Sequence, residues 1–134
     1  MGSAVSLKRE SLEHWLRRLG QAWESADAEL AASLFDPEVL YQENPFDPPI
    51  RGFEAVKRYW LEGLATQRDV KFEGEVLAVE GNVVVVNWRV EFTRVPGGER
   101  VRLDGVSVGR FSAEGRPLEW REWWHREELG HEHG

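Results

Sequence analysis

The chain has 134 residues, no cysteine and a formal net charge of −7. This length suits one domain with a core of its own. The lack of cysteine excludes disulfides and thiolate catalysis, and the acidic net charge argues against a nucleic-acid partner. No apolar run approaches the ~18 residues of a membrane span, and residues 1–10 lack the apolar core of a signal peptide, so we expect a cytoplasmic protein with no membrane partner.

Tryptophan is the unusual feature of the composition, with seven residues against two tyrosines. Tryptophan is bulky and carries an N–H donor that needs a partner when buried. Such enrichment indicates an aromatic-lined cavity or a large interface, or a core that simply uses tryptophan. We expect a single domain over residues 1–134, with a core at about 9–126 and a polar tail at 127–134.

The first third of the chain predicts two helices. Residues 9–23 place apolar side chains at three-and-four spacing along one stripe. The segment 25–27 interrupts this pattern and can start a second, short helix. Asp36-Pro37 ends that helix, because proline disfavours the helical conformation in the residue before it. The first stripe consists of Leu12, Trp15, Leu16, Leu19, Ala22 and Trp23.

The remaining elements are mainly strands. Residues 39–44 predict a short strand, 45–52 a proline-rich loop and 53–66 a third helix. The period then switches to two, which predicts strands over 70–80, 83–95, 101–111 and 117 to about 126, with turns at 81–82, 97–98 and 112–115. Residues 129–134 are expected to fray. Helices followed by a meander of strands predict an α+β domain with a mainly antiparallel sheet.

Several segments, taken in their order and spacing, resemble the SnoaL-like branch of the NTF2-like superfamily over residues 11–126. They are Ala22-Trp23 with Asp27, residues 34–39, residues 41–46, Pro49 with Arg51-Gly52, Tyr59-Trp60, residues 104–106, Gly115 and residues 120–124. The resemblance implies an α+β cone in which three N-terminal helices pack on a curved sheet, with a pocket on the concave face and often a homodimer. Relatives include polyketide cyclases, ketosteroid isomerases, limonene epoxide hydrolases, dehydratases and binding modules, so the resemblance leaves the activity open.

Strand parity predicts which residues face the pocket. If the turn at 97–98 has two residues and the turn at 112–115 has four, the register is fixed on both sides. One face is then apolar apart from Ser107 and Glu122, and we expect it to be concave. It collects Trp88, Val90, Phe92, Leu103, Gly105, Ser107, Leu118, Trp120, Glu122 and Trp124. The other face mixes charged and apolar residues, including Arg89, Glu91, Val106 and Trp123, and suits a homodimer interface.

Two carboxyl groups are candidate acid–base residues. Glu122 would lie among tryptophans, where desolvation raises a carboxyl pKa, although a rim glutamate paired with an arginine is the alternative. By the resemblance, Glu43 matches an acidic or amide position that points into the cone, and Tyr41 matches an aromatic hydrogen-bond donor. Two pocket carboxyl groups with different environments can divide the acid and base roles. A single buried carboxyl group, satisfied by Tyr41 or Trp60, remains the alternative.

Two known catalytic patterns of the family fit poorly. Arg89 and Glu91 resemble part of the epoxide hydrolase triad, but parity places them on the face opposite Glu122 unless a bulge intervenes. The ketosteroid isomerase pattern would place its oxyanion tyrosine near Leu19 and its paired acid near Ser107, whereas these positions hold a leucine and a serine.

Three functional hypotheses follow: acid–base chemistry on a small hydrophobic molecule, binding of such a molecule without chemistry, or a structural homodimer whose cone is filled by tryptophans. In the first, Glu43 and Glu122 transfer protons and Tyr41 orients. No metal or cofactor is expected, because His131-x-His133 lies in the tail and no metal-binding spacing occurs. The residues expected to shape the pocket are Trp15, Leu19, Trp60, Trp88, Phe92, Ser107, Trp120 and Trp124.

Overall fold

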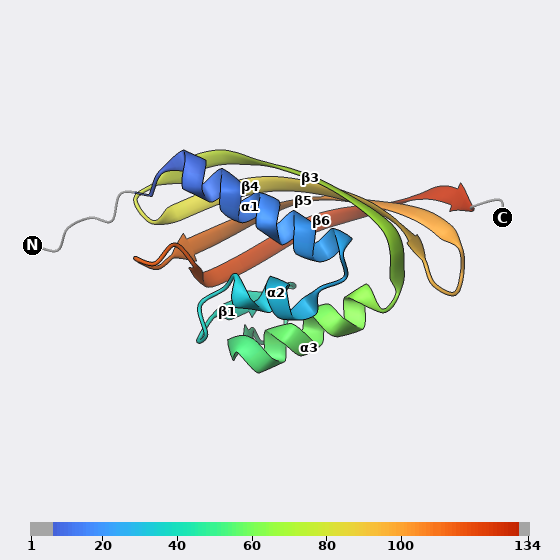
Figure 1. Ribbon diagram of the computed structural model, residues 1–134, viewed down its shortest axis with the longest axis horizontal. Coiled ribbons are helices and arrows are strands. Elements are labelled where there is room, and N and C mark those ends of the chain that lie inside the picture. Colours follow the sequence, from blue (N-terminus) through green and yellow to red (C-terminus); the bar gives the residue numbers. More distant parts are fainter. Residues whose placement is uncertain (1–6, 132–134) are drawn as a thin grey trace, which may run out of the picture.

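The structure is a computed structural model that describes residues 7–131. Two layers make up the molecule, a long curved sheet and a set of helices on one side of it (Figure 1). No helix within the described residues is long and apolar enough to cross a membrane. In chain order the elements are α1 (Arg9–Glu24), α2 (Ala28–Ser33), β1 (Leu40–Gln42), β2 (Ile50–Arg51), α3 (Gly52–Leu64), β3 (Gln67–Glu80), β4 (Val83–Arg94), β5 (Glu99–Phe111) and β6 (Pro117–His131).

The six strands form one sheet in the order β2-β1-β6-β5-β4-β3. The pair β1–β6 is parallel and all other neighbours are antiparallel. The four long strands form the meander that the sequence predicts, and β1 joins its far edge beside β6. This arrangement confirms the predicted α+β fold. It also brings Tyr41 on β1 next to Trp120 on β6 in the register, which sets up the site described below.

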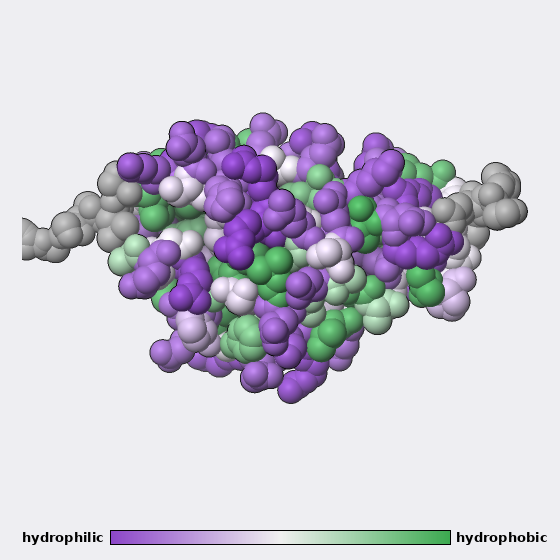
Figure 2. All heavy atoms as spheres, viewed as in Figure 1, coloured by the Kyte–Doolittle hydropathy of each residue, from purple (hydrophilic) through white to green (hydrophobic). Residues whose placement is uncertain are grey.

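The helices cover the concave side of the sheet. The apolar stripe of α1 is buried against β3, while hydrophilic residues cover most of the molecular face seen in Figure 2. Asp27 caps α2, since its carboxylate accepts a hydrogen bond from the backbone N–H of Leu30 at 3.0 Å. The helices α2 and α3 pack on each other and form a second group beside α1 (Figure 1). A hollow therefore remains between the sheet and α3.

Several element ends differ from the predicted ones. The strand β3 begins at Gln67 rather than at residue 70, and a short strand, β2, lies in the proline-rich loop. The predicted fraying after Leu129 is wrong for residues 129–131, because β6 continues to His131 and pairs there with Glu99 at the start of β5. Residues 132–134, including His133, lie outside the described residues.

The predicted strand register is shifted, yet the predicted face is right for Trp88, Trp120 and Glu122, whereas Leu118, at the bulge of β6, is 38% exposed. Trp88 pairs with Gly105 rather than with Ser107, because the loop after β4 holds four residues instead of two. Glu122 pairs with Ser107, again two residues from the predicted partner, with a bulge at the turn between β5 and β6. Each of these two register errors is a shift of two residues. Since side chains alternate with a period of two, an even shift leaves each side chain on its face.

Aromatic residues form two clusters along the concave face. At one end, Trp15 and Phe35 pack with Tyr41, Phe111 and Trp120, with ring centroids 5.2 to 5.6 Å apart. At the other end, Trp23 contacts Trp60, Phe72 and Trp88 at 5.1 to 5.8 Å. The first cluster is solid core, and the second stands beside the hollow.

Glycine on β5 makes room for the second cluster. A Cβ atom on Gly105 would lie 2.5 Å from the Trp88 ring, so the indole lies directly over the strand only because no side chain is there. The Trp88 Nε1–H then donates a hydrogen bond to the Ser107 hydroxyl at 2.8 Å. Ser107 is thus the polar partner that lets this tryptophan be buried.

Candidate ligand cavity and buried carboxyl group

A cavity of about 490 Å³ lies between the concave face of the sheet and α3. Its wall is mainly aromatic and aliphatic, which is typical of small-molecule sites. The hollow persists because Trp88 and Trp124 stand on its wall while Trp120 lies in the core, so these three tryptophans do not fill the cone. The lining residues are Trp23, Tyr41, Tyr59, Trp60, Glu62, Gly63, Leu64, Thr66, Gln67, Trp88, Phe92, Arg94, Leu103, Glu122, Trp124 and Arg126.

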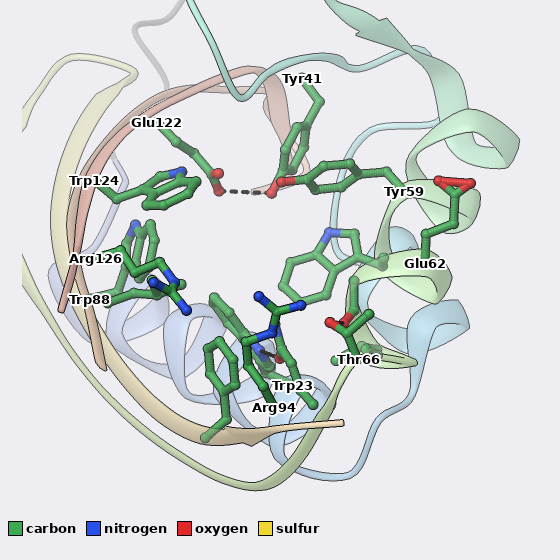
Figure 3. Close-up of a pocket in the computed structure, with 16 residues that line it drawn as sticks. Trp23, Tyr41, Tyr59, Glu62, Thr66, Trp88, Arg94, Glu122, Trp124 and Arg126 are labelled. Carbon is green, nitrogen blue, oxygen red and sulfur yellow. Dashed lines mark hydrogen bonds between the residues drawn. The ribbon is translucent and has the colours of Figure 1, made fainter. Parts of the chain in front are cut away.

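Glu122 is the carboxyl group of the cavity wall. It points inward from β6 and is only 8% exposed. The Tyr41 hydroxyl donates a hydrogen bond to its Oε2 atom at 2.7 Å (Figure 3), and the Trp120 indole N–H donates to the same atom at 3.0 Å. No described residue donates to Oε1. One oxygen of the carboxyl group is therefore held in place, and the other is available to a bound molecule.

Burial sets the protonation of Glu122. Desolvation raises the pKa of this carboxyl group from an ordinary 4.5 to about 7, against the opposing effect of the two hydrogen bonds from Tyr41 and Trp120. The negative charge of Glu43 raises the pKa further. Near neutral pH both the acid and the carboxylate forms of Glu122 are populated. A group in that condition can give or take a proton with little free-energy cost.

Two tyrosines stand beside this carboxyl group. The rings of Tyr41 and Tyr59 lie 5.3 Å apart, and Figure 3 shows their hydroxyl groups pointing toward each other next to Glu122. Burial, followed by the charge of Glu122, raises the pKa of both phenols above the ordinary value of 10. Both therefore stay neutral. Tyr41 uses its proton on Glu122, whereas the Tyr59 hydroxyl donates to no described residue.

Trp60 forms part of the cavity wall. It lines the cavity from α3 and is 6% exposed, and its indole N–H is buried without a hydrogen-bond partner among the described residues. A buried N–H without a partner costs about 1–3 kcal/mol. The ring of Trp60 therefore contributes apolar surface to the cavity.

The predicted pocket residues fall into two groups. Tyr41, Trp60, Trp88, Phe92, Glu122 and Trp124 line the cavity. Trp15, Leu19, Ser107 and Trp120 are buried in the core and support the wall from behind. Glu43 follows the end of β1, is half-buried and lies outside the lining, so the structure does not bring it into contact with Glu122.

Some lining residues were not predicted. Tyr59 lies three residues after Val56 and next to Trp60 on α3, so the three-and-four spacing that places Val56 and Trp60 inward also reaches it. Arg94 and Arg126 carried a usable signal. Each is the next inward position after Phe92 and Trp124, respectively, so one more step of the alternation reaches it.

The residues that resemble the epoxide hydrolase triad lie elsewhere. Arg89 and Glu91 are on the outer face of β4 and do not line this cavity, and Glu91 lies 3.8 Å from Arg100 in an ion pair. The described residues contain no group of three histidine, aspartate or glutamate side chains placed to hold a metal ion. The polar chemistry inside the cavity thus rests on the buried Glu122 carboxyl group and two phenols, with Glu62 and the arginines among the exposed lining residues.

Comparison with known proteins gives the family. Residues 16–120 match the SnoaL-like domain family, and the chain belongs to it. The fold is similar to SalBIII, described as an epoxide hydrolase/cyclase-like enzyme in pyran ring formation in the polyether salinomycin, with a TM-score of 0.74, 18% identity, and coverage of 87% of this chain and 92% of that one. It is also similar to a candidate isomerase from Bacillus subtilis, with a TM-score of 0.77, 18% identity, and coverage of 89% and 90%. No curated protein sequence matches the chain.

Proposed function

We propose that this protein binds a small, largely hydrophobic molecule in the cavity and that Glu122 exchanges a proton with it. The observation that carries the proposal is the Glu122 carboxyl group, held through Oε2 by Tyr41 and Trp120 and open to the cavity through Oε1. Its pKa of about 7 lets it act as acid or base near neutral pH. The aromatic wall supplies binding by burial of apolar surface.

The proton transfer would proceed between Oε1 of Glu122 and a C–H or O–H group of the ligand. As negative charge develops on a ligand oxygen, the Tyr59 hydroxyl is the neutral donor available to stabilise it. Isomerisation, cyclisation, dehydration and hydrolysis all use such a step without a redox change. The two similar folds carry names from the same range, cyclase-like and isomerase.

Glu43 has a secondary part in this proposal. Because it lies outside the cavity wall, it acts through its charge, which raises the pKa of Glu122. The acid and base roles would then belong to one carboxyl group that is protonated and deprotonated in turn. Glu43→Gln is expected to lower the pKa of Glu122 and to leave ligand binding in place.

The test uses nitrobenzisoxazole, a neutral aromatic probe whose ring opens when a base removes its C–H proton. Proton removal by a positioned base contributes about 100-fold or more. We expect the wild-type protein to open the probe with a rate that rises through pH 7 as Glu122 ionises, and Glu122→Gln to lose at least about 100-fold. Glu114→Gln, in the exposed turn after β5, is the matched control and should keep the full rate.

Binding is measured beside turnover. Tryptophans line the cavity, so quenching of intrinsic fluorescence reports occupancy. Probe binding that survives Glu122→Gln while turnover is lost supports catalysis. Binding without turnover in the wild-type protein supports instead a binding module with the same pocket. If the probe neither binds nor reacts, the proposed pocket function is wrong.

We also propose a homodimer through the outer face of the sheet. Val106 and Trp123 are cross-strand neighbours there and are 37% and 44% exposed, an unusual position for a tryptophan. The Arg121 guanidinium lies 5.3 Å from the Trp123 ring, and both apolar side chains remain exposed beside it. Light scattering after size exclusion should give twice the chain mass, and Trp123→Glu should give a folded monomer. A wild-type monomer would contradict the interface.

A further inference from the structure

The inward row of β4 ends in an arginine, and the inward row of β6 reaches an arginine just before Glu128. In β4 the row runs Trp88, Val90, Phe92 and Arg94, and in β6 it runs Trp120, Glu122, Trp124 and Arg126. Both arginines line the cavity and both are exposed. The concave face thus changes from a buried carboxyl group, through aromatic rings, to two cations at the opening.

Neither cation forms an ion pair with a described residue. Arg102 and Arg110, on the outer face of β5, form ion pairs with Glu127 and Glu119. Among the described residues, however, neither Arg94 nor Arg126 has an ion pair or a side-chain hydrogen bond, although Glu99 lies beside Arg94 across the hairpin.

The close-up view shows where these cations point. Both guanidinium groups are directed into the opening, whereas the carboxylate of Glu62 is directed away from it (Figure 3). The cavity mouth therefore presents positive charge to an entering molecule, on a chain whose formal net charge is −7.

We propose that the ligand is amphipathic and carries a carboxylate, which Arg126 and Arg94 bind at the mouth while the apolar body lies along the tryptophans. This inference rests on the proposed function and names its ligand class. Arg126 is four residues from Glu122 on one strand, which places their Cα atoms about 13 Å apart. This backbone spacing sets the length scale of the apolar body that would lie between the ligand carboxylate and the group that meets Glu122.

The chemistry of arginine favours a carboxylate. The planar guanidinium donates two parallel N–H bonds to the two oxygens of a carboxylate, which a neutral head group cannot accept in the same way. Both arginines are exposed, so water and salt weaken each contact. We therefore expect the pair together to favour an acid over its neutral isostere by about tenfold, or about 1.4 kcal/mol.

The experiment compares decanoic acid with decanamide, which differ in charge and hardly in shape. Dissociation constants come from quenching of intrinsic fluorescence at low salt and about pH 8, where the acid is ionised. We expect the wild-type protein to bind the acid about tenfold more tightly than the amide. In the double variant Arg94→Gln/Arg126→Gln the preference should vanish through weaker acid binding, with amide binding unchanged. Arg58→Gln, which removes an exposed arginine of α3 outside the cavity, should keep the full preference.

Each outcome has a distinct meaning. Equal affinity of the wild-type protein for acid and amide overturns the carboxylate site but leaves the proposed function in place, since the neutral nitrobenzisoxazole tests that function separately. A preference for the acid that survives in the double variant overturns the assignment to Arg94 and Arg126. If the protein binds neither decanoic acid nor decanamide, this inference is wrong. If nitrobenzisoxazole also fails to bind or react, the proposed function is wrong as well.

Discussion

The closed and open ends of the cavity place a charged residue in different environments, although the residues at both ends belong to the strand β6. Glu122 and Arg126 are four residues apart on the inward face of β6. At the closed end, burial raises the pKa of Glu122 and two hydrogen bonds fix one of its oxygens. At the open end, water surrounds Arg126, and its charge stays available to a ligand. The alternation of a strand chooses the face, and the depth of burial decides what a charged residue there can do.

The largest expected difference between the two ends is in packing. Trp120 is 1% exposed and contacts Trp15 and Phe35, whereas Trp124 is 37% exposed on the cavity wall. Trp120→Ala should lower the free energy of unfolding by about 3–5 kcal/mol, the usual cost of removing a buried aromatic ring. Trp124→Ala should cost about 1 kcal/mol or less. Urea denaturation of both variants measures this, and equal losses would contradict the division into a solid end and a hollow end.

The second expected effect is a fall in stability with rising pH. The folded protein holds the Glu122 proton up to about pH 7, whereas the unfolded chain releases it near 4.5, so the native state binds more protons between these values. The free energy of unfolding therefore decreases as the pH rises across this window, by about 3 kcal/mol in all, and is constant with respect to this group outside it.

The control for this effect is Glu122→Gln, whose amide oxygen can still accept from Tyr41 and Trp120. In this variant the fall between pH 4.5 and about 7 should disappear, so that above pH 7 it is at least as stable as the wild-type protein. Denaturation curves at a series of pH values give the comparison. An identical pH profile in the two proteins would assign the effect to other groups.

A smaller change is expected from Tyr41→Phe at the closed end. The Tyr41 hydroxyl donates to the Glu122 carboxylate at 2.7 Å and thereby lowers its pKa, so removing the hydroxyl should raise that pKa above 7. The free energy of unfolding of the variant should also fall by about 1–3 kcal/mol above pH 7, because the ionised carboxylate has lost one of its two hydrogen-bond donors. The pH profile of nitrobenzisoxazole opening should move to higher pH. A shift to lower pH would show that the hydrogen bond favours the protonated form.

The smallest expected effect is a different response to added salt at the two ends of the cavity. Exposed charges more than about 10 Å apart are screened at 0.1 M salt, whereas buried groups are screened much less. Added salt should therefore reduce the preference of the protein for decanoic acid over decanamide by a few-fold and leave the pH profile of Glu122 nearly unchanged. Calorimetric titration at low and high salt measures the first quantity. A preference insensitive to salt would place the carboxylate away from the exposed arginines.

The sequence predicts which face of the sheet a side chain occupies better than it predicts the strand register. Trp88, Trp120 and Glu122 were placed on the concave face by counting from turns, and the two errors in register were both even, so the faces survived. Burial of apolar residues constrains parity strongly, whereas loop length, which sets register, depends on turn geometry that the glycines at 97–98 leave open.

The site itself was only partly predictable. By the resemblance Glu43 points into the cone, but β1 ends at Gln42 and Glu43 lies outside the cavity lining. Tyr59 follows from the three-and-four spacing of Val56 and Trp60 on α3, although that spacing alone marks an inward side chain and not a cavity wall. Arg94 and Arg126 follow from the alternation, one step beyond Phe92 and Trp124.

The most direct test of the account is the pKa of Glu122, measured by carbon-13 NMR of the protein labelled at glutamate side-chain carboxyl groups. The signal absent from the Glu122→Gln spectrum identifies the residue. We expect this signal to titrate near pH 7 and its midpoint to move when a ligand is bound. A midpoint near the ordinary value of 4.5 would show that the carboxyl group is solvated and ionised, and would contradict its role as a proton donor and acceptor in the cavity.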